Sequence, residues 1–200
     1  MNNKRIKHIQ NIFTQLGLII KREDLVIKGI SDRDLQELLE DQLLIRVKPG
    51  YYYWNENQNF DDKEIIQSLF PRGVFSIFTT ASMYELTTIN PMSLHMTIPS
   101  SMTKPVLPEY PPIELYYISE KNLELGCVEE KMEHEIIRIY DPERTVCDFF
   151  KYMDKTGKDV AEEVIKNYLS SRNRRIQKLY EYARKLRVMN HIKAYVEILT

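Results

Sequence analysis

The stretch from Gly29 to Trp54, which reads GISDRDLQELLEDQLLIRVKPGYYYW, constrains the fold of this chain more than any other part of the sequence. Ser31 is a favourable N-cap, and Asp34 can accept a hydrogen bond from the N–H of that cap, as in a capping box. Leucines at helical spacing follow and give the helix one inward side. They are Leu35, Leu38 and Leu39. The sequence therefore predicts a short capped helix that begins after Ser31.

A tight hairpin is predicted directly after this helix. Leu44 to Lys48 alternates in the manner of a strand. Pro49-Gly50 suits a type II turn, because glycine tolerates the positive φ of its second central position. Tyr51 to Trp54 is an aromatic run that returns as the second strand.

Two further helices are predicted upstream. From Asn3 to Leu16 apolar residues recur every three or four positions, and Gly17 is well placed to end that helix. Residues 18–20 form either a brief strand or a linker, and Lys21 to Ile27 forms the second helix. Helices followed by such a hairpin are typical of a winged helix-turn-helix, in which one helix enters a DNA groove and the hairpin flanks it. We therefore predict a winged helix-turn-helix DNA-binding domain over residues 1–58.

The remainder, residues 63–200, is predicted to be an α+β domain whose helices come last, so the whole chain is expected to be α+β. The polar stretch Asn55 to Asp62 is the expected linker. A helix within residues 74–84 is expected to be capped by Ser76, Thr79 or Thr80, and Asp141 with Pro142 marks the start of a helix that ends near Gly157. The other expected elements are strands at 94–98, 113–119 and 135–140 and helices at 63–69, 158–170 and within 173–199.

Composition argues against several classes of protein. The chain has no run of about 18 apolar residues, so no membrane span is expected. Its first residues, MNNKRIKHIQ, precede no apolar region of the secretory kind. Cys127 and Cys147 lack CxxC spacing, so we expect no disulfide framework and a reducing, cytoplasmic location.

Formal charge is spread unevenly along the chain. Residues 1–60 carry nine Lys or Arg and eight Asp or Glu, and residues 61–150 carry seven and fifteen. Residues 151–200 carry twelve and six, which gives this last segment a formal charge of +6. A basic end suggests that the last helices share in any binding of nucleic acid, and a chance segregation of surface charge is the alternative.

Signals of catalysis are missing from the sequence. It contains none of the motifs GxxxxGK[ST], GxGxxG, HExxH or GxSxG. The four histidines, His8, His95, His134 and His191, are scattered without ligand spacing. The acids between Glu129 and Glu135 crowd around His134, and a solvated charged edge beside a strand is favoured over a carboxylate site. We predict no catalytic residue, metal or cofactor; an enzyme with an unrecognised site in residues 63–150 is the least favoured reading.

The outward face of the helix after Ser31 is the expected reader of bases. Arg33 and Gln36 are the side chains suited to guanine and adenine respectively. Because residues 31–41 hold five acids and one arginine, this helix alone repels a duplex, and flanking cations must supply the attraction. Those cations are Lys4, Arg5, Lys7, Lys21, Arg22, Lys28, Arg46 and Lys48. A winged helix used for protein contacts is the alternative.

A second basic surface is expected near the end of the chain. Arg174, Lys178 and Lys185 are spaced to lie on one helical face, opposite an apolar face. This surface is a candidate DNA clamp. An ordinary solvated face explains the same spacing, and RNA or an acidic protein would satisfy the same charges.

The order of motifs along the chain carries a family resemblance. The pattern GIS…LLIRVKPGYY is followed by FPRGVFSIFTTASMYEL at residues 70–86, by a proline-rich passage, and by ERTVCD at residues 143–148. This order, over nearly all 200 residues, resembles the AbiEi family of abortive-infection antitoxins.

The resemblance implies a two-part protein. The winged helix would repress the promoter of its own operon, typically at inverted repeats, with Ser31, Arg33, Gln36, Arg46 and Lys48 facing double-stranded DNA. The C-terminal domain would counteract a nucleotidyltransferase-like toxin encoded alongside, without needing a stable complex. The alternative is a transcriptional regulator whose C-terminal domain senses a ligand or a partner. For Arg144 and Asp148 the resemblance names no role, but their spacing of four predicts a buried pair that fixes the helix onto the sheet.

Overall fold

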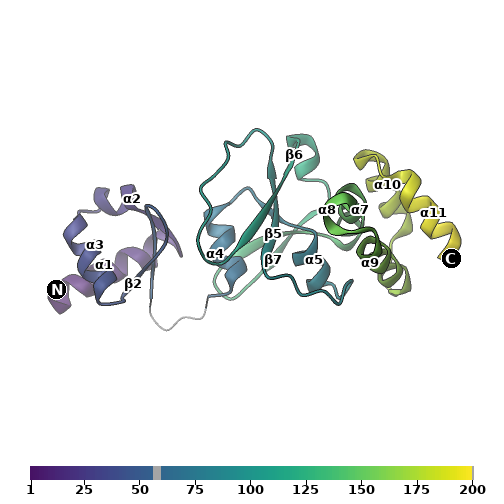
Figure 1. The fold of residues 1–200 in the computed structure, drawn as a ribbon. Helices are drawn as coiled ribbons and strands as arrows, with labels where there is room; N and C mark the ends of the chain where they lie inside the picture. The colour runs from purple at the N-terminus through teal and green to yellow at the C-terminus, as the bar shows by residue number, and fades with distance from the viewer. Residues whose placement is uncertain (56–59, 200) are drawn as a thin grey trace. The chain divides into compact units, whose positions relative to one another are not determined.

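A computed structural model describes residues 1–55 and 60–199 (Figure 1). Over these residues the chain is a mixture of α and β structure with two sheets. It divides into two compact units. The first comprises Met1–Pro71, Pro105–Pro112 and Met132–Glu135, and the second comprises Arg72–Lys104, Ile113–Lys131 and Ile136–Thr200. The predicted boundary between residues 58 and 63 stays a prediction.

The first unit contains four of the helices and a small antiparallel sheet. Its elements are α1 (Asn3–Leu16), β1 (Ile20–Lys21), α2 (Arg22–Ile27), α3 (Asp32–Glu40), β2 (Leu44–Lys48), β3 (Tyr51–Trp54) and α4 (Asp62–Leu69). The strands are ordered β1-β3-β2, with β3 antiparallel to both neighbours. The helices and the hairpin follow the sequence prediction closely. Of the two alternatives for residues 18–20, the brief strand is the one observed, although β1 covers Ile20–Lys21.

Local sequence signals explain these elements. The side chain of Ser31 accepts from Asp34 N and the side chain of Asp34 accepts from Ser31 N, so the predicted capping box of α3 is confirmed. Gly50 has the positive φ, 79°, that the hairpin turn requires. Apolar side chains of α1, α2, α3 and the sheet then share one core. Its most buried members are Ile9, Leu25, Ile30, Leu38 and Leu44.

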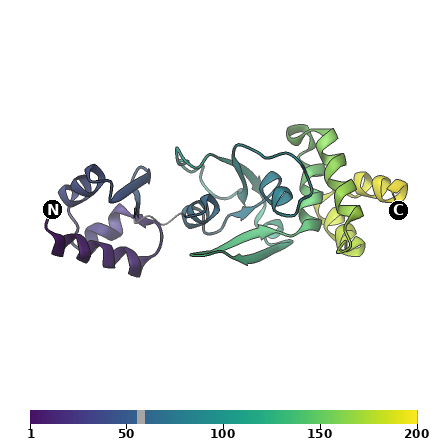
Figure 2. The same ribbon diagram turned by 90° about the horizontal axis from the view of Figure 1, so that it is seen from below.

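The second unit is built on a five-stranded mixed sheet (Figure 2). Its elements are β4 (Val74–Phe75), α5 (Phe78–Met83), β5 (Leu94–Pro99), β6 (Ile113–Ile118), α6 (Glu120–Leu123), β7 (Cys127–Lys131), β8 (Ile136–Tyr140), α7 (Pro142–Lys151), α8 (Met153–Thr156), α9 (Lys158–Ser170), α10 (Ile176–Leu186) and α11 (Met189–Leu199). The strand order is β6-β5-β4-β8-β7. The pairs β4–β8 and β5–β6 are parallel, and β4–β5 and β7–β8 are antiparallel.

Helix α7 is the centre of the helical layer of this unit. It packs against both α9 and α10, and α10 packs against α11 (Figure 1). Asp141 caps α7 by accepting from Arg144 N, and Pro142 occupies its first position, as predicted. Val146 and Phe149 of α7, with Ala161 of α9 and Leu179 of α10, are fully buried in one core.

Two expectations for the second unit were wrong. No side chain caps α5: its N-cap is Ile77, at φ 50°, because the nearby hydroxyls bond elsewhere. Thr79 accepts from His95 N, for example, and Thr80 donates to the carbonyl of Ile77. The helix expected to run to Gly157 is interrupted at Tyr152, which separates α7 from α8. The short elements β4, α6 and β7 were not predicted from the sequence.

Among the described residues, no helix has both the length and the apolar character that a membrane span needs.

Candidate nucleic-acid interface

Arg33 and Gln36 lie on the solvent side of α3, opposite its buried leucines. The side chain of Arg33 is 88% exposed. Each of the two is held by an acid one turn later on the helix: Arg33 Nε lies 3.1 Å from Glu37 Oε1, and Gln36 Nε2 donates to Glu40 Oε1 at 3.0 Å. The structure therefore presents both predicted base-reading side chains outward, with one nitrogen of each already engaged by an acid of the same helix.

Ser31 is also exposed, but its hydroxyl serves the helix. It accepts from Asp34 N at 3.1 Å and donates to Asp34 Oδ2 at 3.0 Å. A duplex near this residue would therefore compete with the capping box.

The acids in the first turn of α3 are neutralised by cations from α1 and α2. Arg22 forms a two-pronged pair with Asp32, through Nε–Oδ1 at 2.9 Å and Nη2–Oδ2 at 2.6 Å. Arg5 Nη2 lies 2.7 Å from Asp34 Oδ2. The hydrogen bond from Arg5, helped by the bonds from Ser31, lowers the pKa of Asp34 to about 2. Arg5 and Arg22 were expected to attract phosphates. In the structure each neutralises an acid of α3 instead, which reduces the repulsion between α3 and a duplex.

The hairpin presents one of its two predicted cations. Arg46 is exposed, whereas Lys48 is only 8% exposed. Lys48 Nζ donates to the carbonyl of Val106 at 3.2 Å and lies 4.4 Å from the centre of the Tyr51 ring and 5.1 Å from that of Phe70. Burial lowers the pKa of Lys48, and the charge of Lys21 adds to this effect. The DNA-facing role expected for Lys48 therefore finds no support in its surroundings.

A small set of cations in the first unit remains available. They are exposed and have no acidic partner within the part of the unit that the structure describes. They are Lys4, Lys7, Lys21, Lys28 and Arg46. Lys21 and Lys28 are the N-cap and the C-cap of α2, and Arg46 lies on β2, so these three belong to the elements that precede and follow α3 in the chain.

The predicted basic stripe of the C-terminal helices is not one helical face. Arg174 precedes α10, whose N-cap is Arg175, and its Nη1 donates to the carbonyl of Ser171 at 3.1 Å. Lys178 Nζ lies 2.7 Å from Asp141 Oδ2. Lys185 Nζ lies 2.6 Å from Glu181 Oε1, in an exposed pair. The prediction that these three residues share a face was wrong, because α10 begins two residues after Arg174.

Arg144 and Asp148 form the buried pair that their spacing predicted. Arg144 Nε lies 2.9 Å from Asp148 Oδ1, and neither side chain is exposed. Arg144 Nη1 also donates to the carbonyls of Asn122 and Leu125, at 2.8 and 2.6 Å. Burial raises the pKa of Asp148, and the charge of Arg144 opposes that shift. Through these two carbonyls the pair ties α7 to α6 and to the segment that follows α6, which is an architectural role.

Two more acids at the start of α7 are buried, and their partners were not predicted from the sequence. Asp141 and Glu143 were understood only as a helix cap and a first-turn acid. In the structure they contact Arg175 and Lys178, more than thirty residues later in the chain. In the sequence, only the spacing of Arg175 and Lys178, about one helical turn apart, indicated that the two cations could contact the same group of acids.

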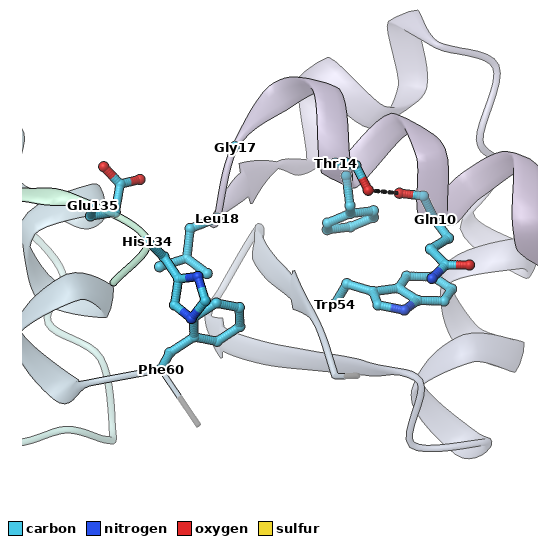
Figure 3. A pocket seen from close by; sticks show the side chains of 9 residues that line it. Gln10, Thr14, Gly17, Leu18, Trp54, Phe60, His134 and Glu135 are labelled. Atoms are coloured by element: carbon cyan, nitrogen blue, oxygen red, sulfur yellow. Dashed lines mark hydrogen bonds between the residues drawn. The ribbon is translucent and has the colours of Figure 1, made fainter. Parts of the chain in front are cut away.

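A hollow of about 240 Å³ in the first unit is lined by residues of α1 and β3, by the two residues after α1, and by residues 60, 134 and 135 (Figure 3). Its lining residues are Gln10, Phe13, Thr14, Gly17, Leu18, Trp54, Phe60, His134 and Glu135. The hydroxyl of Thr14 donates to the carbonyl of Gln10, and Glu135 accepts from Ser68. The walls of the hollow thus include the aromatic side chains of Phe13, Trp54 and Phe60, and the buried indole N–H of Trp54 has no hydrogen-bond partner among the described residues.

Near His134, the acids Glu129, Glu130 and Glu133 are exposed, in agreement with the favoured interpretation of a solvated charged edge beside a strand. Glu64, at the start of α4, is buried and accepts from the backbone N–H groups of His134 and Glu135, at 2.6 and 3.0 Å. Across residues 1–55 and 60–199, no group of three or more His, Cys, Asp or Glu could hold a metal ion.

Comparisons with known proteins add no identification. No protein-family model matches the chain, and no curated protein matches it.

Proposed function

We propose that this chain is a DNA-binding transcriptional repressor and that its first unit contains a winged helix-turn-helix. One observation carries the proposal: α2 and α3 are followed directly by the hairpin β2–β3, and β1 completes a three-stranded sheet beside it. This is the order of elements in a module whose second helix reads the major groove. Arg33 and Gln36 on the outer face of α3 supply the donors and acceptors for reading bases.

The charges of the first unit support separate roles for α3, which would read bases, and for the exposed cations, which would contact phosphates. The ion pairs of Arg5 and Arg22 leave the start of α3 close to neutral, so α3 can approach a duplex without strong repulsion. The unpaired cations Lys21, Lys28 and Arg46 then hold phosphates. Lys48 is left out of this set because it is buried.

The antitoxin role rests on the sequence resemblance. We propose that the chain represses its own operon at inverted repeats and that the second unit counteracts a nucleotidyltransferase-like toxin encoded alongside. The buried ERTVCD motif supports a structural part for α7 in that unit, because Arg144 and Asp148 bond to the protein itself. A regulator whose second unit senses a ligand or partner is the competing proposal.

A gel-shift assay with the operon promoter tests the DNA-reading proposal. Gln36→Ala should reduce the preference for the promoter over a scrambled duplex by about 1–3 kcal/mol, because one base contact is lost. Arg46→Ala should weaken binding to both duplexes alike and flatten the dependence on salt. Lys104→Ala removes an exposed charge from the second unit and is the matched control. If Gln36→Ala and Lys104→Ala behave alike, α3 is not the reader.

Toxin neutralisation needs a separate test. The chain and the neighbouring gene are co-expressed, and growth is followed with the parent and with the Gln36→Ala variant. Both should restore growth, since neutralisation is assigned to the second unit. Lack of a nucleotidyltransferase-like gene beside this one, or lack of rescue by the parent, would refute the antitoxin role and leave the regulator.

A further inference from the structure

Glu143 is a buried acid whose charge is balanced by a residue of the basic end of the chain. It is 1% exposed. Its Oε1 accepts from Arg175 Nε at 3.1 Å and from the hydroxyl of Tyr168 at 3.0 Å. Its Oε2 accepts from Arg175 Nη2 at 2.8 Å. The carboxylate of Glu143 therefore holds two of the nitrogens of one guanidinium.

Asp141 repeats this arrangement beside it. Its Oδ2 lies 2.7 Å from Lys178 Nζ and accepts from the hydroxyl of Tyr182 at 3.1 Å. The same ammonium lies 3.9 Å from Glu143 Oε2. Although burial lowers the pKa of Lys178, the bond to Asp141 raises it, and the pKa ends above its ordinary value.

These two acids have no other cation to neutralise them among the residues that the structure describes. The third buried acid of α7, Asp148, is matched by Arg144. If Arg175 and Lys178 turned toward another anion, Asp141 and Glu143 would become unpaired charges inside the protein, which is strongly unfavourable.

Both cations nevertheless face solvent in part, with side chains 56% and 30% exposed for Arg175 and Lys178. They contribute two of the positive charges of residues 151–200, whose formal charge is +6, but their acidic partners lie outside that segment. Pairing therefore leaves that segment with a charge of +4 for external anions.

We propose that Glu143 and Asp141 hold Arg175 and Lys178 in competition with external polyanions. The two acids would thereby weaken the binding of nucleic acid at the basic end of the second unit. This inference goes beyond the function proposed above and rests on the expectation from the sequence that the basic end of the chain shares in binding nucleic acid. A phosphate that approaches Arg175 meets a guanidinium whose Nε and Nη2 already point at Glu143. Loss of the charge of Glu143 would release the cation and strengthen the contact.

The test uses the full chain with Glu143→Gln and a fluorescein-labelled duplex of scrambled sequence. Glutamine keeps an oxygen that can accept from Tyr168 but carries no charge. Fluorescence anisotropy should show binding severalfold tighter than that of the parent at low salt. The slope of log affinity against log salt should steepen by about 0.9, the value for one added phosphate contact.

Glu163→Gln is the matched control. It removes the same charge from the same unit, but Glu163 accepts from Thr87 and Thr88 rather than from a cation. Equal binding by the Glu143 and Glu163 variants overturns the proposal. Adding Arg175→Gln to Glu143→Gln should abolish the gain.

A second comparison covers the case in which Glu143→Gln does not fold. In the otherwise unchanged chain, Arg175→Gln should cost little affinity, whereas Arg172→Gln, which removes an exposed neighbouring cation, should reduce it. Equal losses overturn the proposal. Because the anisotropy comparisons use a scrambled duplex, they do not depend on the promoter gel-shift assay. A negative result in either experiment therefore leaves the other interpretable.

Discussion

Breaking the Arg144–Asp148 pair should destabilise the second unit more than its single hydrogen bond suggests. Arg144→Met leaves Asp148 as an unpaired charge with no exposed surface and takes the donors from the carbonyls of Asn122 and Leu125. Asp148→Val leaves the guanidinium unpaired instead. Removal of one partner from a buried ion pair costs about 3–5 kcal/mol, a large share of the roughly 5–15 kcal/mol that stabilises a domain.

The double variant is the decisive comparison. With both charges gone, methionine and valine fill a similar volume with apolar atoms, and the desolvation cost of two ions disappears. The carbonyls of Asn122 and Leu125 still lack a donor, at a cost of about 1–3 kcal/mol. The double variant should therefore be more stable than either single variant, although less stable than the parent.

Urea unfolding followed by far-ultraviolet circular dichroism measures these differences. Lys185 and Glu181 supply the control cycle, since they have the same spacing of four and a comparable distance, 2.6 Å, but are both exposed. Their coupling should be a small fraction of that of the buried pair. A double variant less stable than both single variants would refute the reasoning, because it would mean that the charges do not cost stability when left alone.

Three other expectations follow from single contacts. Lys48→Met should leave binding to a scrambled duplex nearly unchanged in the gel-shift assay, and a loss equal to that of an exposed cation would contradict its burial. Gly126→Ala should cost more stability in urea unfolding than Gly29→Ala. Their φ angles are 77° and 76°, but only the first Cβ would meet another side chain, at 2.6 Å. Asp34, whose pKa is about 2, contributes stability that is complete above pH 4 and is lost as the pH falls toward 2. Arg5→Gln should bring that pKa toward 3.8 in an NMR titration, and an unchanged pKa would refute the pairing.

Short-range signals in the sequence were reliable because the groups involved lie within one turn of each other. The capping box of Ser31 and Asp34, the turn at Gly50 and the pair Arg144–Asp148 all depend on spacings of four residues or fewer. Each of these was recovered from residue types and spacing alone.

The candidate site was harder to predict, because partners distant in the sequence decide which charges are available. Nothing near Lys48 in the chain indicates that its ammonium bonds to the carbonyl of Val106. Likewise the pairing of Arg175 with Glu143 depends on how α10 packs on α7. A count of basic residues therefore overestimates the attraction that either unit offers to a polyanion.

If α3 reads bases as proposed, the ion pair between Arg33 and Glu37 affects how strongly the protein discriminates against incorrect bases. Arg33 must exchange Glu37 for a base edge, so a correct base replaces one acceptor by another. A base that presents no acceptor in that position, such as cytosine, leaves the broken ion pair uncompensated. Selectivity at that position would then come from the rejection of mismatched sites rather than from tight binding of the correct one.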